Sequence, residues 1–298
     1  MSVALFIKSV ESWIDSYFES LAKVYTETGQ SKALALKRSN FPTALYRYRS
    51  LERLAYKLEE LRDGYVFLSD PAKFNDPYDS ALSVSWEQVQ KQVLEKFGIE
   101  YSKFFESLEE SQKEEWRIQQ EQGFQSPGLL SLFGPSADPF SWFQNLVRVS
   151  CFATNPNSVV MWSHYANQHT GICIEFSRSS MLSSAKFLEL LHPVRYSEKI
   201  LDAFQLTWPN MPEEVWHILA ACHKSKEWEY ENEWRLVSLD PASGGKFFLD
   251  PCGIKPSRII LGERIDQPNQ AAIEELAQKI SVPVIKAELA KDRFKIQF

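Results

Sequence analysis

The chain has 298 residues, of which 44% are hydrophobic and 24% charged, and its formal net charge at pH 7 is -6. These values are typical of globular proteins and exclude a disordered or fibrous chain. The acidic balance argues against a protein that coats nucleic acid through a globally positive surface. No apolar run approaches the roughly 18 residues of a membrane span, and Lys8 interrupts the first apolar segment, so we expect a cytoplasmic protein without membrane contact.

Common catalytic motifs are absent. The chain has 11 glycines, whereas the average content of about 7% would give about 21. Neither GxGxxG nor GxxxxGK[ST] occurs, and GxSxG, HExxH and an EF-hand loop are missing as well. The four cysteines are widely spaced without a CxxC pair, which predicts reduced thiols rather than disulfides or a four-cysteine zinc site.

The N-terminal region has apolar residues at helical spacing over its first 25 residues, which predicts an amphipathic helix. We interpret residues 1–40 as a helical extension whose apolar face is a candidate homodimer surface. Residues 41–298 then form a single domain.

A strand–helix–strand unit is expected at the start of this domain. Its elements are a strand over 44–49, a helix over 51–61 and a strand over 65–69. Ser50 is a candidate N-cap of the helix, and Gly64 is placed to end it in a left-handed conformation.

The middle of the chain, at about 85–140, is predicted to be a helical insertion. It contains helices over 85–98 and 101–122 and a Ser-, Pro- and Gly-rich loop over 125–139.

The second half alternates strands and helices. Strands are predicted over 146–153, 171–177, 230–239, 258–261, 282–288 and 294–298, helices over about 210–226 and 268–280, and a short aromatic helix or turn over 161–166. Together these elements predict an α+β fold with a central mixed, largely antiparallel or split sheet, flanking helices and the helical insertion.

Two acids and a base recur at the period of a strand in Glu231, Glu233 and Arg235. On one face, such a carboxylate pair suits acid–base work or the stabilisation of an oxocarbenium ion, with Arg235 offsetting the repulsion. The alternative interpretation is a solvent-facing strand with surface ion pairs.

A second cluster consists of Trp162, His164, Tyr165 and His169. The two histidines would point in different directions on one helix, and even with Cys173 they offer only three metal ligands. We therefore favour a hydrogen-bonded structural histidine that packs with Trp and Tyr in the core, and we expect no metal.

A third pattern is Tyr46-Arg47-Tyr48-Arg49, in which a strand would send the arginines to one face and the tyrosines to the other. Arginine suits a diphosphate and tyrosine can stack on a base or a nicotinamide ring; the alternative is a strand with one polar edge. If the strands over 44–49 and 65–69 pair, the residues near this face would include Ser69, Asn75 and Asp76.

Basic residues are concentrated between residues 31 and 57, where they are accompanied by one acid, Glu52. They are Lys32, Lys37, Arg38, Arg47, Arg49, Arg53 and Lys57. Such a patch could attract an anion, and the alternative is a solvated helix face.

Several of these stretches together resemble a large prokaryotic family of unknown function. They are Tyr46–Arg49, Phe74–Pro77, Met161–Ala166 with His169 and Gly171, and Tyr230–Arg235. The resemblance runs from about residue 44 to the C-terminus and implies no activity.

A more distant resemblance is to ADP-ribosyltransferases, whose order of elements is similar: an Arg-bearing strand, a helix, a strand that ends in Ser, and a late Glu-x-Glu strand. It implies that Glu233 stabilises a ribosyl oxocarbenium ion with Glu231 as its helper. Arg47 or Arg49 would anchor NAD, and Ser69 or Tyr65 would contact the nicotinamide.

The candidate catalytic residues are therefore Glu231, Glu233, His164 and Tyr165. The candidate NAD-binding residues are Tyr46, Arg47, Arg49, Tyr65, Ser69, Asn75, Asp76, Trp162 and Arg235. The expected function is metal-independent consumption of a small-molecule nucleotide, NAD, with an undefined acceptor macromolecule and a role in microbial conflict or defence.

Two other classes of function stay open. One is a non-enzymatic protein that binds a ligand or a partner through an aromatic pocket, for which the nine tryptophans are suited. The other is a metal-dependent nuclease that would use His164, His169 and Glu175.

Overall fold

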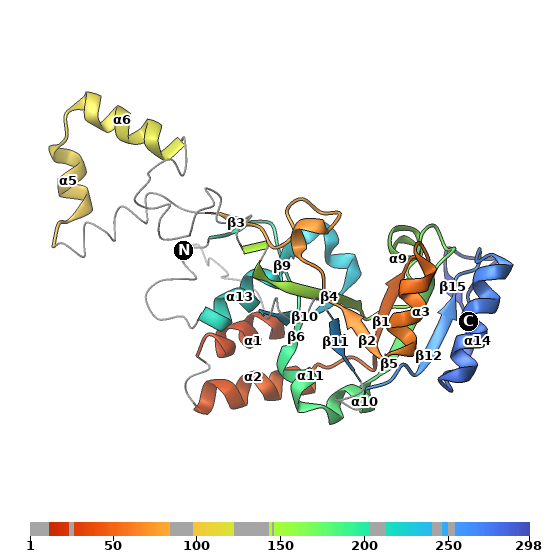
Figure 1. The fold of residues 1–298 in the computed structure, drawn as a ribbon. Helices are drawn as coiled ribbons and strands as arrows, with labels where there is room; N and C mark the ends of the chain where they lie inside the picture. The colour runs from red at the N-terminus through yellow and green to blue at the C-terminus, as the bar shows by residue number, and fades with distance from the viewer. Residues whose placement is uncertain are drawn as a thin grey trace, which may run out of the picture.

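A computed structural model of the chain describes residues 12–23, 27–83, 98–121, 143–144, 146–202, 213–239, 246–249 and 254–298. A seven-stranded sheet forms its centre, with the strand order β13-β12-β5-β1-β4-β10-β6. Neighbouring strands are antiparallel except for the parallel pair β12 and β13. The strands are β1 (Ala44–Arg49), β4 (Arg148–Ala153), β5 (Ile172–Ser177), β6 (Leu191–Pro193), β10 (Glu233–Ser238), β12 (Arg258–Leu261) and β13 (Val284–Lys286). The predicted α+β class with a mixed, largely antiparallel sheet is confirmed (Figure 1).

Short strands form two-stranded pairs beside this sheet. They are β2 (Tyr65–Phe67) with β11 (Lys246–Phe248), β3 (Leu82–Ser83) with β8 (Leu201–Asp202), β7 (Arg195–Ser197) with β9 (His223–Ser225), and β14 (Glu288–Leu289) with β15 (Ile296–Gln297). The strand β1 therefore does not pair with β2, and the shared face considered for them does not form by that route.

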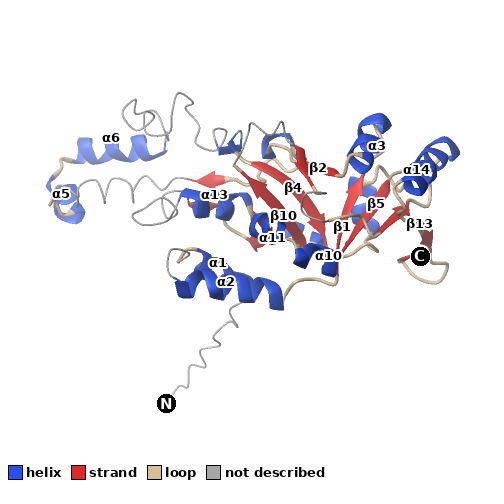
Figure 2. Cartoon of the chain, turned by 60° about the horizontal axis from the view of Figure 1, so that its bottom comes forward, coloured by secondary structure: helices blue, strands red, loops and turns tan. Residues whose placement is uncertain are grey.

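Helices cover both faces of the sheet and one of its ends, whereas α5 (Tyr101–Ser107) and α6 (Glu110–Glu121) stand apart from it (Figure 2). The helices near the sheet are α1 (Trp13–Leu21), α2 (Glu27–Ser39), α3 (Leu54–Arg62), α9 (Val159–Tyr165), α10 (Arg178–Ser183), α11 (Ala185–Leu190), α13 (Glu213–Ala221) and α14 (Gln267–Lys279), with 3-10 turns η1 (Pro71–Lys73) and η2 (Lys226–Glu231).

Several predicted boundaries are wrong for local reasons. Ser50 is not the N-cap of α3: Arg53 occupies that position with a φ of 57°, and the hydroxyl of Ser50 instead accepts a hydrogen bond from the amide of Glu52. Gly64 ends the helix at a φ of 65°, as predicted. The single helix predicted over 101–122 is two helices, α5 and α6, and the helix over 85–98 and the loop over 125–139 lie outside the described residues apart from Gly98.

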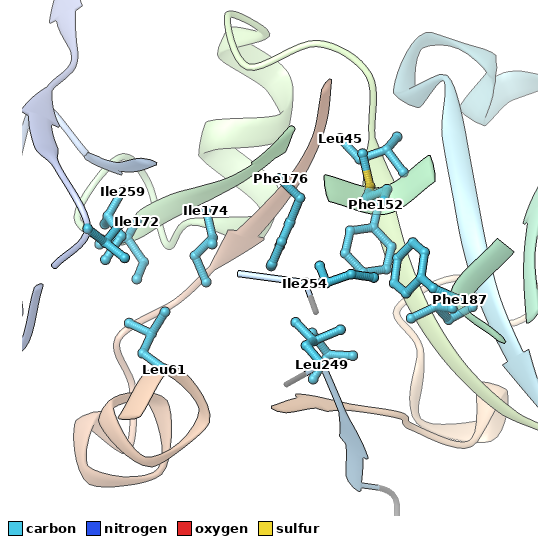
Figure 3. Packing of buried hydrophobic residues seen from close by; sticks show 14 of the residues in the cluster. Leu45, Leu61, Phe152, Ile172, Ile174, Phe176, Phe187, Leu249, Ile254 and Ile259 are labelled. Atoms are coloured by element: carbon cyan, nitrogen blue, oxygen red, sulfur yellow. The ribbon is translucent and has the colours of Figure 1, made fainter. Parts of the chain in front are cut away.

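The main apolar core lies on one face of the sheet. Because side chains alternate along a strand, Ile172, Ile174 and Phe176 of β5 point to the face that also holds Leu45 and Phe152. Figure 3 shows these side chains directed at a shared interior. The helices α3 and α14 lie side by side over this face.

The opposite face carries two separate apolar clusters. Tyr48 and Cys173 pack against Met161 and Trp162 of α9, whereas Val149 and Val237 pack near α13 and α1. Between these two clusters lie the polar side chains of β10, Glu233 and Arg235, which form the centre of the site described below.

The N-terminal helix α1 packs against the sheet. Ser12 caps it by accepting a hydrogen bond from the amide of Asp15, and Tyr17 and Phe18 are buried. The ring of Trp13 stacks on Trp234 of β10, with centroids 6.0 Å apart. The described part of the extension thus uses its apolar face within the chain, the face that we considered for a homodimer.

Among the described residues, no helix combines the length and the hydropathy needed to cross a bilayer.

Replacement of a core ring should show how much of the stability depends on the main core. Phe152 is buried against Phe176 and Phe187, so we expect Phe152→Ala to lower the free energy of unfolding by about 3–5 kcal/mol through lost contacts and a cavity. Chemical denaturation measures this change. Phe294→Ala, at a fully exposed ring, is the control and should change stability by less than about 0.5 kcal/mol.

Candidate active site

A cavity opens where two neighbouring strands diverge. The strand β1 pairs with β5 at six register positions but with β4 only at Tyr46 and Ala153. The chain after β2 takes the free place beside β4, because the backbones of Ser69 and Val149 exchange two hydrogen bonds of 2.8 Å. The strands β1 and β4 thus remain neighbours in one sheet but diverge on either side of this single pair.

The cavity has a volume of about 360 Å³, and residues of β1, β4, β10 and α9 contribute to its lining. The chain leaves β1 for α3 over one face, and it leaves β4 for α9 over the other. Tyr46, Arg47, Arg49, Ser69, Asn75, His164, Tyr165, Glu231, Glu233 and Arg235 line it, together with residues that include Tyr48, Phe67, Lys73, Phe74, Asp79, Ser150, Cys151 and Lys224. Ten of the thirteen candidate residues thus meet at one cavity.

Arg235 is the centre of the charge network in the cavity wall, and it is 0% exposed. Its guanidinium donates to both oxygens of Asp79, at 2.8 and 2.6 Å, and to both oxygens of Glu233, each at 3.0 Å. It also donates to the carbonyl of Ala221 at 2.6 Å. Such fork-to-carboxylate geometry fixes both acids, because the planar guanidinium leaves few alternative arrangements.

Lys224 joins the second carboxylate to this network. Its Nζ donates to Oε2 of Glu231 at 2.6 Å and to Oε2 of Glu233 at 3.1 Å, and it lies 3.7 Å from Asp79. The other oxygen of Glu231 accepts a hydrogen bond of 2.7 Å from the hydroxyl of Tyr165. Glu231 therefore has one charged and one neutral partner, whereas cations contact both oxygens of Glu233.

A backbone feature brings the two carboxylates together. Glu231 ends the 3-10 turn η2 and does not lie on the strand, which begins only at Glu233. Between them, Asn232 adopts a φ of 45°, a left-handed conformation that asparagine tolerates better than most residues. The predicted strand over 230–239 is thus too long at its start, and the co-facing of Glu231 and Glu233 comes from this turn.

The environments of the two carboxylates shift their acidity in opposite directions. Burial raises the pKa of Glu231, and the charge of Glu233 adds to this effect against the attraction of Lys224. Burial also disfavours the charged form of Glu233, but Arg235 and Lys224 outweigh it and lower its pKa to about 2. Glu233 is therefore ionised at neutral pH, and Glu231 is the carboxylate whose proton is held more tightly.

A second group of charges joins β1 to α3, and its two arginines, Arg47 and Arg49, line the cavity. Glu60 accepts from Arg47 at 3.3 Å, from Arg49 at 2.7 Å and from the amide of Phe67 at 3.1 Å. Arg47 also donates to the carbonyl of Phe67 at 2.9 Å. The arginines that the resemblance assigns to NAD are thus oriented by a buried carboxylate of α3.

Three candidate binding residues lie outside the cavity lining. Tyr65 packs on Phe248, and the carboxylate of the buried Asp76 accepts from the amide of Tyr78 at 2.9 Å. Trp162 is fully buried, and its indole donates to the carbonyl of Pro156 at 2.8 Å. All three residues therefore make contacts within the fold and do not line the cavity in this geometry.

The histidines and Glu175 do not converge on one point. His169 stacks on Trp162, and its Nε2 lies 3.2 Å from the hydroxyl of Ser163, so it matches the structural interpretation. His164 is exposed beside Trp228, and Glu175 pairs with Arg258 at 2.5 Å. In the described ranges, no three His, Cys, Asp or Glu side chains are grouped so as to hold a metal ion.

Sequence reasoning missed Asp79, Lys224 and Glu60. Asp79 pairs with Arg235, 156 positions away, whereas Lys224 and Glu60 pair with residues 7 to 13 positions away on a neighbouring element, and in neither case does the period of a single helix or strand identify the pair. For Lys224, the apolar stretch of α13 that precedes it indicates burial, and a buried lysine needs a charged partner.

Comparisons with known proteins give a family match for part of the chain. A family model described as "Protein of unknown function (DUF2971)" matches residues 161–236, about a quarter of the chain. The match includes Tyr165, Lys224, Glu231, Glu233 and Arg235 and supports the resemblance to a family of unknown function. Neither the curated proteins nor the solved structures contain a match.

The low pKa of Glu233 predicts how the free energy of unfolding depends on pH. Since this folded-state pKa lies below the unfolded value, ionised Glu233 stabilises the protein above about pH 4.5, and this contribution is lost as the pH falls towards 2. We expect it to be on the order of 2 kcal/mol. Denaturant unfolding between pH 2 and 7 should show a shallower acid dependence for Glu233→Gln than for the parent.

The matched control is Glu106→Gln, at an exposed position on α5, which should keep the slope of the parent. An equal slope for Glu233→Gln would show that Glu233 titrates normally in the folded state.

Proposed function

We propose that the protein cleaves the nicotinamide–ribose bond of NAD without a metal and transfers ADP-ribose to an acceptor. The resemblance to ADP-ribosyltransferases suggests the reaction. The observation that carries it is the pair Glu231 and Glu233, held in one cavity wall with pKa values shifted in opposite directions. Pairs of this kind divide the roles of charge stabilisation and proton transfer between them.

The electrostatics of the cavity wall suit a positively charged transition state. Asp79, Glu231 and Glu233 are three acids, and Lys224 and Arg235 are two cations, so the fully ionised network retains one negative charge. The network is buried, where the effective dielectric constant is lower than in water. Fixed charges in such a site stabilise a developing oxocarbenium ion without reorganisation at the moment of reaction.

The proposed reaction has two steps, cleavage of the nicotinamide–ribose bond and transfer to the acceptor. The bond between C1 of the ribose and the pyridinium nitrogen breaks, its electron pair neutralises the nicotinamide, and the sugar becomes an oxocarbenium ion next to Glu233. The nucleophilic atom of the acceptor then bonds to C1 and transfers its proton to ionised Glu231. The raised pKa of Glu231 makes it the better base of the two.

The cavity volume limits how NAD would bind. About 360 Å³ lies at the lower end of the range for sites of drug-sized ligands, so we expect the nicotinamide riboside half to enter. Tyr46 supplies an aromatic face at the wall, while Arg47 and Arg49 supply guanidinium groups for the phosphates. A role in microbial conflict or defence rests on the resemblance alone.

Release of nicotinamide from NAD tests the proposal. We expect the parent protein to release it, and Glu233→Gln to reduce the rate by about 100-fold or more, since it removes the charge next to the oxocarbenium ion. Glu231→Gln should instead slow the transfer of ADP-ribose to the acceptor, the step in which Glu231 takes up a proton. Chromatographic quantification of free nicotinamide measures the rate. Glu106→Gln, remote from the cavity, should match the parent.

The result is interpretable only for folded variants, so circular dichroism and thermal unfolding accompany each assay. Loss of release in a folded Glu233→Gln supports the assignment, and unchanged release contradicts it. If the parent releases nothing but NAD quenches its tryptophan fluorescence saturably, the non-enzymatic binding protein becomes the better interpretation.

Tyr165→Phe separates proton transfer from charge stabilisation. The hydroxyl of Tyr165 stabilises ionised Glu231, so its loss should raise the pKa of Glu231 further. The acidic limb of the pH–rate profile for ADP-ribose transfer to the acceptor should then move to higher pH, while the rate at alkaline pH changes little. An unshifted profile would show that Glu231 does not act as the base.

A further inference from the structure

The group of charges that joins β1 to α3 has more positive than negative side chains. Arg47 and Arg49 of β1 share a single buried carboxylate, Glu60, with Lys57, which lies one helical turn before it. Arg53 lies one turn before Lys57 and also acts on it electrostatically. In the described part of the chain, no carboxylate lies within ion-pair distance of Arg53 or Lys57.

Burial and the surplus of positive charge together lower the pKa values of Lys57 and Arg49. Burial, and then the repulsion of Arg49, lowers the pKa of Lys57 to about 8, although Glu60 opposes the shift. Burial and the neighbouring Arg47 lower the pKa of the Arg49 guanidinium to about 10. Arg47, Arg49 and Lys57 are buried or half-buried around one acid and leave two positive charges, which is costly unless an anion is present, and the exposed Arg53 adds a third positive charge beside Lys57.

Two further observations point to the position of that anion. The Nε of Arg49 is buried and has no hydrogen-bond partner in the described structure. The helix α3 begins without a side-chain cap, and Arg53 stands at its N-cap position with a φ of 57°. The start of the helix thus has no side-chain cap, one nitrogen of Arg49 lacks an acceptor although another pairs with Glu60, and Arg53 and Lys57 have no ion pair in the described ranges, a combination that favours an anion there.

We propose that Arg49, Arg53 and Lys57, with the N-terminus of α3, form a binding site for a phosphate monoester. A monoester carries up to two negative charges and three oxygens free to accept, and so matches the surplus better than a diester with its single charge. Arg49 lines the cavity, so the site adjoins it. The ligand class follows from this charge surplus and does not depend on NAD cleavage.

Inorganic phosphate is the probe for the site, with dimethyl phosphate as the singly charged comparison. We expect titration calorimetry of the full chain to show phosphate binding at least 10-fold tighter than dimethyl phosphate. Arg53→Gln and Lys57→Gln should each weaken phosphate binding by about 10-fold or more, since each removes a charge-assisted contact. Arg62→Gln is the matched control, because Arg62 lies on the same helix but pairs with Asp63, and it should bind as the parent does.

Thermal unfolding gives an independent readout. Phosphate should raise the melting temperature of the parent and of Arg62→Gln, but not that of Lys57→Gln. Without phosphate, Lys57→Gln should be at least as stable as the parent, since it relieves repulsion. No binding at 10 mM phosphate, equal binding of dimethyl phosphate, or equal loss in Arg62→Gln would each overturn the proposal.

The source of the monoester is resolved by comparison of ligands. A mononucleotide and a 5'-phosphorylated oligonucleotide are titrated beside an oligonucleotide without the terminal phosphate. Preference for either phosphorylated ligand over the unphosphorylated one supports the site and names its source, whereas equal affinity of the two oligonucleotides contradicts it. These titrations need no turnover, so their outcome is independent of whether the protein cleaves NAD.

Discussion

Burial of the Arg235 guanidinium is the constraint around which the site is organised. A fully buried cation is tolerated only when carboxylates and carbonyls satisfy it, and here Asp79, Glu233 and the carbonyl of Ala221 do so. These partners come from three separate segments, so the guanidinium joins the turn after η1, the end of α13 and the strand β10. Their positions in turn orient Lys224 and, through it, Glu231.

Apolar packing on both sides of this network explains why its charged groups are buried. The polar groups lie between two apolar clusters on one face of the sheet, with Trp162 in one cluster and Val149 in the other. On the opposite face, Trp234 of the same strand stacks on Trp13 of the N-terminal helix. The strand that carries Glu233 and Arg235 is thus held from both faces, which limits how far the two carboxylates can move apart.

The divergence of β1 and β4 within the sheet supplies the space that a ligand would need. Because β1 and β4 pair at one position only, side chains that belong to opposite faces, such as Tyr46 and Arg49, reach the same cavity. One wall has surplus negative charge, and the group of charges that joins β1 to α3 has surplus positive charge. This separation suits a ligand that combines a cationic reacting centre with phosphate groups.

The sequence by itself determined the elements with strong local signals: the alternating strands β1 and β5, the helix α14, and the left-handed Gly64. It also brought Glu231, Glu233 and Arg235 into one hypothesis, although by a strand that in fact starts at Glu233. Only the tertiary structure decided that Asp79, Lys224 and Glu60 complete the charge clusters, and that Tyr65, Asp76 and Trp162 do not line the cavity. The physical reason is that periodicity reports the face of a single element, whereas the partner of a buried charge is set by how different elements pack on one another.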